Sequence, residues 1–162
     1  MILGVDPGLA STGYAVVSGV PQRPRVVAWG VIVTAPGTPH ATRLREIHDG
    51  LAQVLLQHPV EGAALETWHI HQHSRAAMGT AEARGAAQVA LAGAGIAVEE
   101  YAPNAIKQAV TGSGRADKAQ VRAMVERLTG VRAASDHASD AMAAALCHLS
   151  VGRFSAAVRR AG

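Results

Sequence analysis

The spacing of the apolar residues changes near residue 40, and this change restricts the folds that the chain can adopt. Before it, three short segments rich in β-branched residues lie at 1–5, 12–17 and 25–34, separated by turns that contain Gly and Pro. After it, from Leu44 to Leu55, the apolar residues recur every three or four positions. Three strands joined by short turns predict an antiparallel meander, and the helical spacing that follows predicts helices packed on that sheet.

The rest of the chain alternates strands with helices. Apolar runs predict strands at 62–66 and 96–101, and helical spacing predicts helices at 74–95, 104–110, 117–128 and 135 to about 151. This order predicts an α/β fold with a five-stranded mixed sheet, in which three antiparallel strands are followed by parallel strands and helices flank the sheet. We expect one domain over residues 1–152 and a loose basic tail over 153–162.

Composition indicates a globular protein and says little about its partner. The 162 residues carry a net charge of +3, which suits a polyanion but is also common in proteins without one. Cys147 is the single cysteine, so a monomer can form no disulfide, and this favours a reducing compartment. The first residues lack the features of a signal peptide, and no apolar run is long enough to span a bilayer. We therefore expect a cytoplasmic protein without a membrane partner.

Two carboxylates end apolar segments where a hydrophobic residue would serve the core better. Asp6 closes the first strand and Glu66 closes the fourth. If these strands are neighbours, the two charges repel each other and lose hydration, and a bound cation relieves both costs. Each residue also has a simpler explanation, Asp6 as a turn residue before Pro7 and Glu66 as a surface residue at a strand end. Their coincidence favours a metal site.

The last helix adds a third acidic position. His137 and Asp140 lie three residues apart, and Asp136 and Asp140 lie four apart, so that each pair shares a helix face. The helix dipole accounts for Asp136 in the first turn, whereas Asp140 lies a full turn inside an Ala-rich helix. Oxygen ligands in an open arrangement suit Mg²⁺ or Mn²⁺, and a cluster of this kind typically holds two ions about 4 Å apart.

Basic residues crowd the stretch around the Gly-containing loop at 111–114. Lys107 precedes the loop, Arg115 follows it, and Lys118 and Arg122 belong to the next helix. Lysines that converge with a helix N-terminus predict a phosphate-binding site, and a solvated charged face is the simpler alternative.

A second basic group and two aromatic rings lie between residues 68 and 84. Arg75 and Arg84 belong to the Ala-rich helix, where Arg84 either pairs with Glu82 or caps a turn. Trp68 and His69 follow the fourth strand and are candidates for contact with DNA bases, with the core as the alternative place for Trp68.

These residues resemble the RuvC family of Holliday junction resolvases in five segments, which occur in order across nearly the whole chain. The segments are ILGVDPGLASTGYAVV, ALETW, EARGAA, EYAPNAIKQAVTGSGRADKAQV and DAMAAALCH, and the fourth is the most specific. The resemblance implies an RNase H-like fold, a homodimer, and paired symmetric nicking of four-way junction DNA in recombination and repair. It also implies products with 5′-phosphate and 3′-hydroxyl ends.

The resemblance also implies roles for individual residues. Asp6, Glu66 and Asp140 occupy the family's acidic catalytic and metal-binding positions, and His137 falls on the fourth such position. We expect two Mg²⁺ or Mn²⁺ ions in each active site, and a dimer surface over residues 74–95 because small residues let helices approach closely. The family's RuvA-RuvB branch-migration complex is a further expected partner. The expected DNA contacts are Lys107, Lys118, Arg115, Arg75, His69 and Trp68.

The chain departs from the common family pattern at two positions. His137 stands where many members have Asp, and because imidazole suits Mn²⁺ better than Mg²⁺, we expect higher activity with Mn²⁺. Asp136 is the alternative ligand after a shift of one residue, and a His137 that binds no metal is a candidate general base. His69 stands where the family often has Phe near the DNA, so either Trp68 or His69 is the candidate stacking residue.

Three other functions fit parts of the pattern. If His137 cannot replace a carboxylate, the chain is a catalytically weak module that binds junctions. The same acidic residues would also serve an RNase H-like nuclease that cuts other substrates such as RNA–DNA hybrids. An actin-like ATPase or sugar kinase opens with a similar strand and turn, but it needs two such domains, and this chain is too short to contain them.

Overall fold

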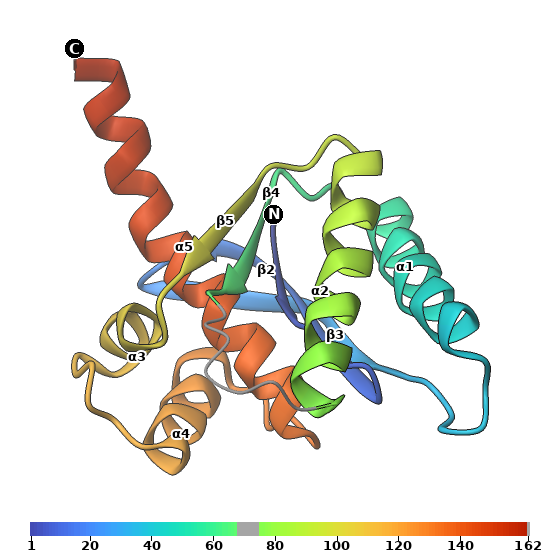
Figure 1. Ribbon diagram of the computed structural model, residues 1–162. Helices are drawn as coiled ribbons and strands as arrows, with labels where there is room; N and C mark the ends of the chain where they lie inside the picture. The colour runs from blue at the N-terminus through green and yellow to red at the C-terminus, as the bar shows by residue number, and fades with distance from the viewer. Residues whose placement is uncertain (68–74, 162) are drawn as a thin grey trace.

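The chain forms a five-stranded sheet with helices on both faces (Figure 1). The computed structural model describes residues 1–67 and 75–161, with side chains described over 1–67 and 77–151. The strands are β1 (Ile2–Asp6), β2 (Ser11–Val20), β3 (Arg23–Val33), β4 (Gly62–Glu66) and β5 (Val98–Tyr101). The helices are α1 (His40–Gln57), α2 (Arg75–Gly93), α3 (Pro103–Thr111), α4 (Lys118–Thr129) and α5 (Asp136–Ala161).

The sheet has the order β3-β2-β1-β4-β5. Strands β1, β2 and β3 pair antiparallel, because only short turns join them, whereas β4 lies parallel to β1 and β5 lies parallel to β4. The predicted meander, the mixed sheet and the adjacency of the first and fourth strands are therefore confirmed. Since β1 and β4 are parallel neighbours, the last residue of each lies at the same edge of the sheet.

Two apolar layers fill the space between the sheet and the helices. Alternate side chains of the central strands, such as Leu3 and Leu65, pack with α1 and α2 on one face. On the other face α5 lies against the sheet through small residues such as Ala141 and Ala145, with α3 and α4 packed around it (Figure 1). The run of small apolar residues from Ala141 to Leu146 in α5 is buried by this packing.

Glycine permits the close approach of α5 to the sheet. A Cβ atom on Gly4 of β1 would overlap the carbonyl group of Ala141, and one on Gly13 of β2 would overlap the carbonyl group of His137. The missing side chains let the first turn of α5 lie directly beside the end of β1. That contact places the residues of the first turn next to Asp6.

Local signals define both ends of α4. Asp117 caps α4 in a capping box with Gln120, and Gly130 ends that helix in the left-handed conformation. The expected end of the last helix was wrong, since α5 continues beyond Val151 to Ala161, so the expected loose tail over 153–162 has a helical backbone as far as it is described. Among the described helices, none has the length and apolar character that crossing a membrane requires.

Candidate active site

The two acidic strand ends meet as their positions predict. The parallel pairing of β1 with β4 runs to Val5 opposite Leu65, and Asp6 and Glu66 are the next residue on each strand. Side chains alternate between the faces of a strand, and Leu3, Val5 and Leu65 face α1 and α2. Asp6 and Glu66 therefore lie on the opposite face, toward α5.

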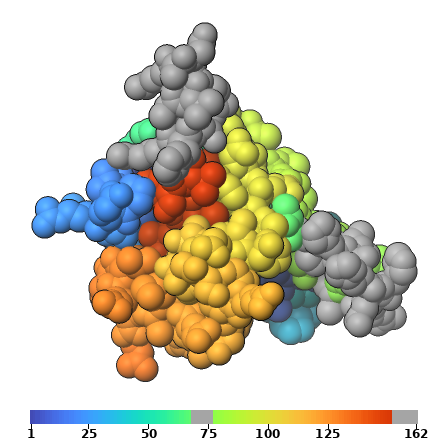
Figure 2. Space-filling model, turned by 90° about the vertical axis from the view of Figure 1, so that its left-hand side faces the viewer, coloured from blue at the N-terminus to red at the C-terminus, as the bar shows by residue number. Residues whose placement is uncertain are grey.

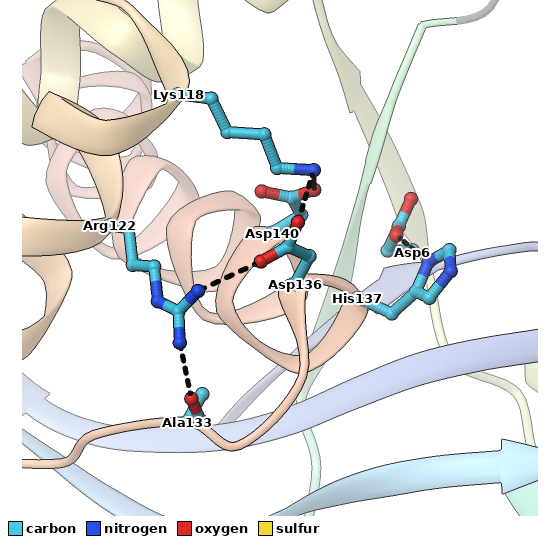
Figure 3. Close-up of polar contacts among 7 residues, drawn as sticks. All are labelled: Asp6, Lys118, Arg122, Ala133, Asp136, His137 and Asp140. Carbon is cyan, nitrogen blue, oxygen red and sulfur yellow. Dashed lines mark hydrogen bonds and ion pairs between the residues drawn. The ribbon is translucent and has the colours of Figure 1, made fainter.

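Helix α5 supplies the remaining predicted residues from its first turns. The ring nitrogen Nδ1 of His137 lies 2.6 Å from Oδ2 of Asp6, which leaves Nε2 as the second ring nitrogen (Figure 3). Asp140 lies one turn further along α5 and lines a cleft of about 190 Å³ together with Asp6 and Glu66. The lining also includes Pro7, Thr67, Thr80 and Arg84.

The carboxylates of this cleft fit divalent cations by their chemistry. Three acidic side chains from distant parts of the chain line one cavity, and oxygen donors of this kind are the preferred ligands of Mg²⁺ and Mn²⁺. In the part of the chain that the structure describes, no three His, Cys, Asp or Glu side chains converge closely enough to hold an ion. In the structure Asp6 instead contacts His137, and Asp140 forms an ion pair with Lys118.

Burial and mutual repulsion make two of these carboxylates easier to protonate. Desolvation raises the pKa of Asp6, and the nearby charge of Asp140 adds to this, while the contact with His137 acts in the opposite direction. Desolvation also raises the pKa of Glu66, reinforced by Asp6 and Asp140. Glu66 is nevertheless exposed along part of its side chain, so solvent limits the size of this effect. A cation bound between Asp6 and Glu66 would favour the ionised form of both carboxylates, so the pair is suited to sharing one.

Lys118 links the first two turns of α5 to α4. Its Nζ lies 3.2 Å from Oδ2 of Asp136 and 3.3 Å from Oδ2 of Asp140 (Figure 3). Partial desolvation acts to lower the pKa of Lys118, but the two carboxylates outweigh it and raise the pKa. Arg122 holds the other oxygen of Asp136 at 3.1 Å and donates to the carbonyl oxygen of Ala133 at 3.3 Å. In this arrangement His137 faces Asp6, whereas Asp136 faces the basic residues of α4.

The predicted basic residues separate into two places. Lys107 and Lys118 line a cleft of about 270 Å³ that also includes Glu66 and Asp140, so the two lysines adjoin the acidic cleft. Arg115 instead lines a separate basin of about 600 Å³ on another face of α4. Helices α3 and α4 form one continuous surface beside these clefts (Figure 2). The expected convergence therefore holds for the lysines and not for Arg115.

Three predicted DNA contacts cannot be placed. Trp68 and His69 lie outside the described residues, and Arg75 begins α2 without a described side chain. The suggested pairing of Arg84 with Glu82 was wrong: its guanidinium pairs with Glu100 and donates to the carbonyl oxygen of Glu66 at the end of β4. Glu82 pairs with His40 of α1.

A hydrogen-bonded clamp on the loop after Asp6 was not predicted. The carbonyl oxygen of Leu9 accepts from Thr34 at 2.6 Å and from Arg43 at 3.2 Å, and Arg43 also donates to the Thr34 hydroxyl at 2.7 Å. Buried Thr12 donates to the carbonyl oxygen of Gly8 at 2.9 Å. Gly8 and Thr12 are only four residues apart, whereas Thr34 and Arg43 lie 25 and 34 residues from Leu9, so only the fold brings these two residues to the loop.

A mixed sheet with acidic residues at the ends of its two adjacent parallel strands and on the helix packed against them defines an RNase H-like nuclease. Comparison with known proteins narrows this class. The chain matches the family described as crossover junction endodeoxyribonuclease RuvC over residues 2–148. The chain belongs to the RuvC family, whose members are metal-dependent nucleases.

Individual relatives support the same assignment over nearly full length. The chain is 46% identical to the crossover junction endodeoxyribonuclease RuvC of Alkalilimnicola ehrlichii, over 99% of this chain and 98% of that one. It is 43% identical to the enzyme of the same description from Parvibaculum lavamentivorans, over 99% and 94% of the two chains. The structure of T. thermophilus RuvC in complex with Holliday junction substrate matches with a TM-score of 0.89 and 32% identity over 95% of each chain. The predicted family and RNase H-like fold are confirmed.

Proposed function

We propose that this chain resolves Holliday junctions by nicking two symmetry-related strands, through phosphodiester hydrolysis that uses two divalent ions in each active site. The observation that carries the proposal is the meeting of Asp6, Glu66 and Asp140 in one cleft that adjoins Lys107 and Lys118. The RuvC relative of the solved complex binds a Holliday junction substrate, which supports the same substrate class for this chain. The free, buried Cys147 is compatible with work in the cytoplasm.

The residues of the cleft divide into those that hold cations and those that hold phosphate. Asp6, Glu66, His137 and Asp140 would bind the ions, which supply an activated water and stabilise the leaving oxygen. Lys107 and Lys118 would bind phosphate oxygens beside the scissile bond, since both line the neighbouring cleft. Lys118 must exchange its contact with Asp140 for phosphate, while Asp136 remains beside it as a second carboxylate.

A comparison of substrates tests this function. We expect the purified protein with Mn²⁺ to cut a labelled four-way junction in preference to linear duplex and RNA–DNA hybrid of the same sequence. Asp6→Asn should abolish cutting while it leaves junction binding intact, because the carboxylate serves the chemistry. Binding without cutting by the wild-type protein would favour a junction-binding module, and preferred cutting of the hybrid would favour another RNase H-like nuclease.

The identity of the metal is tested by titration. With His137 among the ligands, we propose that Mn²⁺ supports faster cutting than Mg²⁺, because imidazole nitrogen is a better ligand for Mn²⁺. His137→Asp should move the preference toward Mg²⁺. Equal or faster wild-type cutting with Mg²⁺ across the whole titration would refute this assignment.

Helix α2 is our proposed contact between two copies of the chain. Met78 and Val89 are 61% and 62% exposed and lie three helical turns apart on one face, with Gly85 between them. A Cβ atom on Gly85 would meet nothing within 4 Å, so this face has room for a neighbouring helix. A symmetric dimer would carry the two active sites that paired nicking requires.

A long polar side chain at Gly85 tests this contact. We expect Gly85→Gln to shift the protein toward monomer in sedimentation and to convert a cruciform plasmid into nicked circles instead of linear molecules. Leu56→Gln is the matched control, because Leu56 is an apolar residue of α1 that is 79% exposed outside the proposed contact. A Gly85→Gln protein that remains dimeric would place the contact elsewhere.

A further inference from the structure

Arg84 is a nearly buried arginine whose guanidinium joins three elements of the fold. Its side chain is only 12% exposed, and it extends from α2 to the edge of the sheet. Nη1 donates to the main-chain carbonyl oxygen of Glu66 at 2.7 Å, and the buried Nη2 lies 2.6 Å from Oε1 of Glu100 on β5, in an ion pair that lacks the alignment of a hydrogen bond. Arg84 also lines the acidic cleft. The two nitrogens thus connect α2, the end of β4 and β5 through one rigid group.

At Glu66 the main chain of β4 is no longer paired with β1. The pairing with β1 ends one residue earlier, at Val5 opposite Leu65. On the other side Glu66 still lies opposite Tyr101, and the next amide, of Thr67, donates to the Tyr101 carbonyl at 2.8 Å. The hydrogen bond from Arg84 therefore fixes the main chain at the residue whose carboxylate enters the cleft.

We propose that Arg84 is a positioning residue, which sets the place of the Glu66 carboxylate by holding its main chain from a guanidinium anchored on Glu100. This inference rests on the proposed function of the cleft. It also makes α2, our proposed dimer helix, part of the support of the active site, because Arg84 directly precedes Gly85. Lysine cannot replace it fully, since a single Nζ cannot repeat the separate contacts of Nη1 and Nη2.

Gln88 offers a matched control. Its Nε2 donates to the same Oε1 of Glu100 at 3.1 Å, from the same helix. Within the described part of the chain Gln88 neither bonds to Glu66 nor lines the acidic cleft, so Gln88→Ala disturbs the connection between α2 and β5 alone. The variants to compare are Arg84→Ala, Arg84→Lys, Glu100→Gln and Gln88→Ala. Each is measured for turnover with Mn²⁺, for junction affinity in Ca²⁺, and for the rise in melting temperature of the DNA-free protein on adding Mn²⁺.

We expect Arg84→Ala to lower turnover about 10- to 100-fold, the usual effect of removing a group that orients a metal ligand. The Mn²⁺ concentration that produces half of the thermal shift should rise with it, while the junction Kd stays within about threefold. Arg84→Lys should recover part of the turnover, Glu100→Gln should give a smaller loss, and Gln88→Ala should match the wild type.

Other outcomes overturn the inference. If Arg84→Ala only lowers the melting temperature and keeps wild-type turnover and Mn²⁺ response, the arginine merely joins α2 to the sheet. If the junction Kd rises in proportion to the loss of turnover, Arg84 binds DNA instead. If Arg84→Ala does not fold, the same three measurements are compared between Arg84→Lys and the wild type. A wild-type protein that does not cut junctions contradicts the proposed function, which separates that failure from failure of this inference.

Discussion

A methyl group added at Gly13 should move the first turn of α5 away from the sheet. A Cβ atom there would lie 2.9 Å from the amide nitrogen of Ala138 and closer still to the carbonyl group of His137, whereas ordinary contact begins at 3.4 Å. The helix must therefore withdraw by at least 0.5 Å from the amide. Clearing the carbonyl group needs a larger shift, on the order of 1 Å, because both neighbours are backbone atoms that cannot rotate away.

This displacement acts directly on the candidate site. The contact of 2.6 Å between His137 Nδ1 and Asp6 Oδ2 joins the turn that must move to the strand that stays in place. We expect Gly13→Ala to cost about 1–3 kcal/mol of unfolding free energy. Turnover in the folded protein should fall up to about 100-fold, the scale expected for a 1 Å misplacement of catalytic groups.

The assay is urea unfolding together with single-turnover cutting of a four-way junction at a temperature where both proteins are folded. Gly93→Ala is the matched control, because a Cβ atom at Gly93 would meet nothing within 4 Å. The control should unfold and cut like the wild type. A Gly13→Ala protein with wild-type turnover would refute the argument that the close approach of α5 to β2 sets the geometry of the site.

Three further predictions concern single residues. Desolvation and the nearby carboxylates raise the pKa of Glu66 in the folded protein, so its ionised form opposes folding above that pKa. Glu66→Gln should therefore raise the melting temperature in EDTA at neutral pH, with a gain in unfolding free energy of less than about 1 kcal/mol because the side chain is partly exposed. The gain should shrink as the pH falls and reverse in Mn²⁺, and a lower melting temperature in EDTA would contradict this account of Glu66. Asp117→Ala should cost about 1 kcal/mol in urea unfolding because it removes the cap of α4, and unchanged stability would show the capping box to be dispensable. Burial raises the pKa of Cys147 to about 11, so a thiol reagent at neutral pH should label it only upon unfolding, and rapid labelling of the native protein would contradict that burial.

Local sequence signals were sufficient for most of the architecture. Apolar runs and helical spacing predicted every described strand and helix. They do so because an element that buries one face must place apolar residues at the spacing of that face along its own sequence. Local hydrogen bonds set both ends of α4, which begins after the N-cap Asp117 and ends at Gly130. The predicted end of α5 was wrong because Gly152, a residue type that often follows the last turn of a helix, lies inside α5, which continues to Ala161.

The acidic strand ends were also visible in the sequence, since a carboxylate that closes an apolar strand is costly without a partner. Asp6 and Glu66 stood out together by this argument, although each alone had a simpler explanation, and Asp140 stood out as a carboxylate one turn inside an Ala-rich helix. The parallel pairing of β1 with β4 then brought Asp6 and Glu66 to the same edge of the sheet. The resemblance to the RuvC family supplied the fourth position, His137. Its contact with Asp6 depends on the distance between α5 and β2, which no local pattern encodes.

The sequence by itself determined the strands, the helices, the acidic residues and the family, because these depend on neighbours along the chain or on motifs read in order. Only the tertiary structure decided which charges meet. In the folded protein Lys118 pairs with Asp136 and Asp140, and Arg115 lines a basin separate from the two lysines. Arg84 contacts Glu66 and Glu100. A long charged side chain on a helix can reach several partners with similar free energy. Which partner it contacts therefore depends on how the helices pack against the sheet.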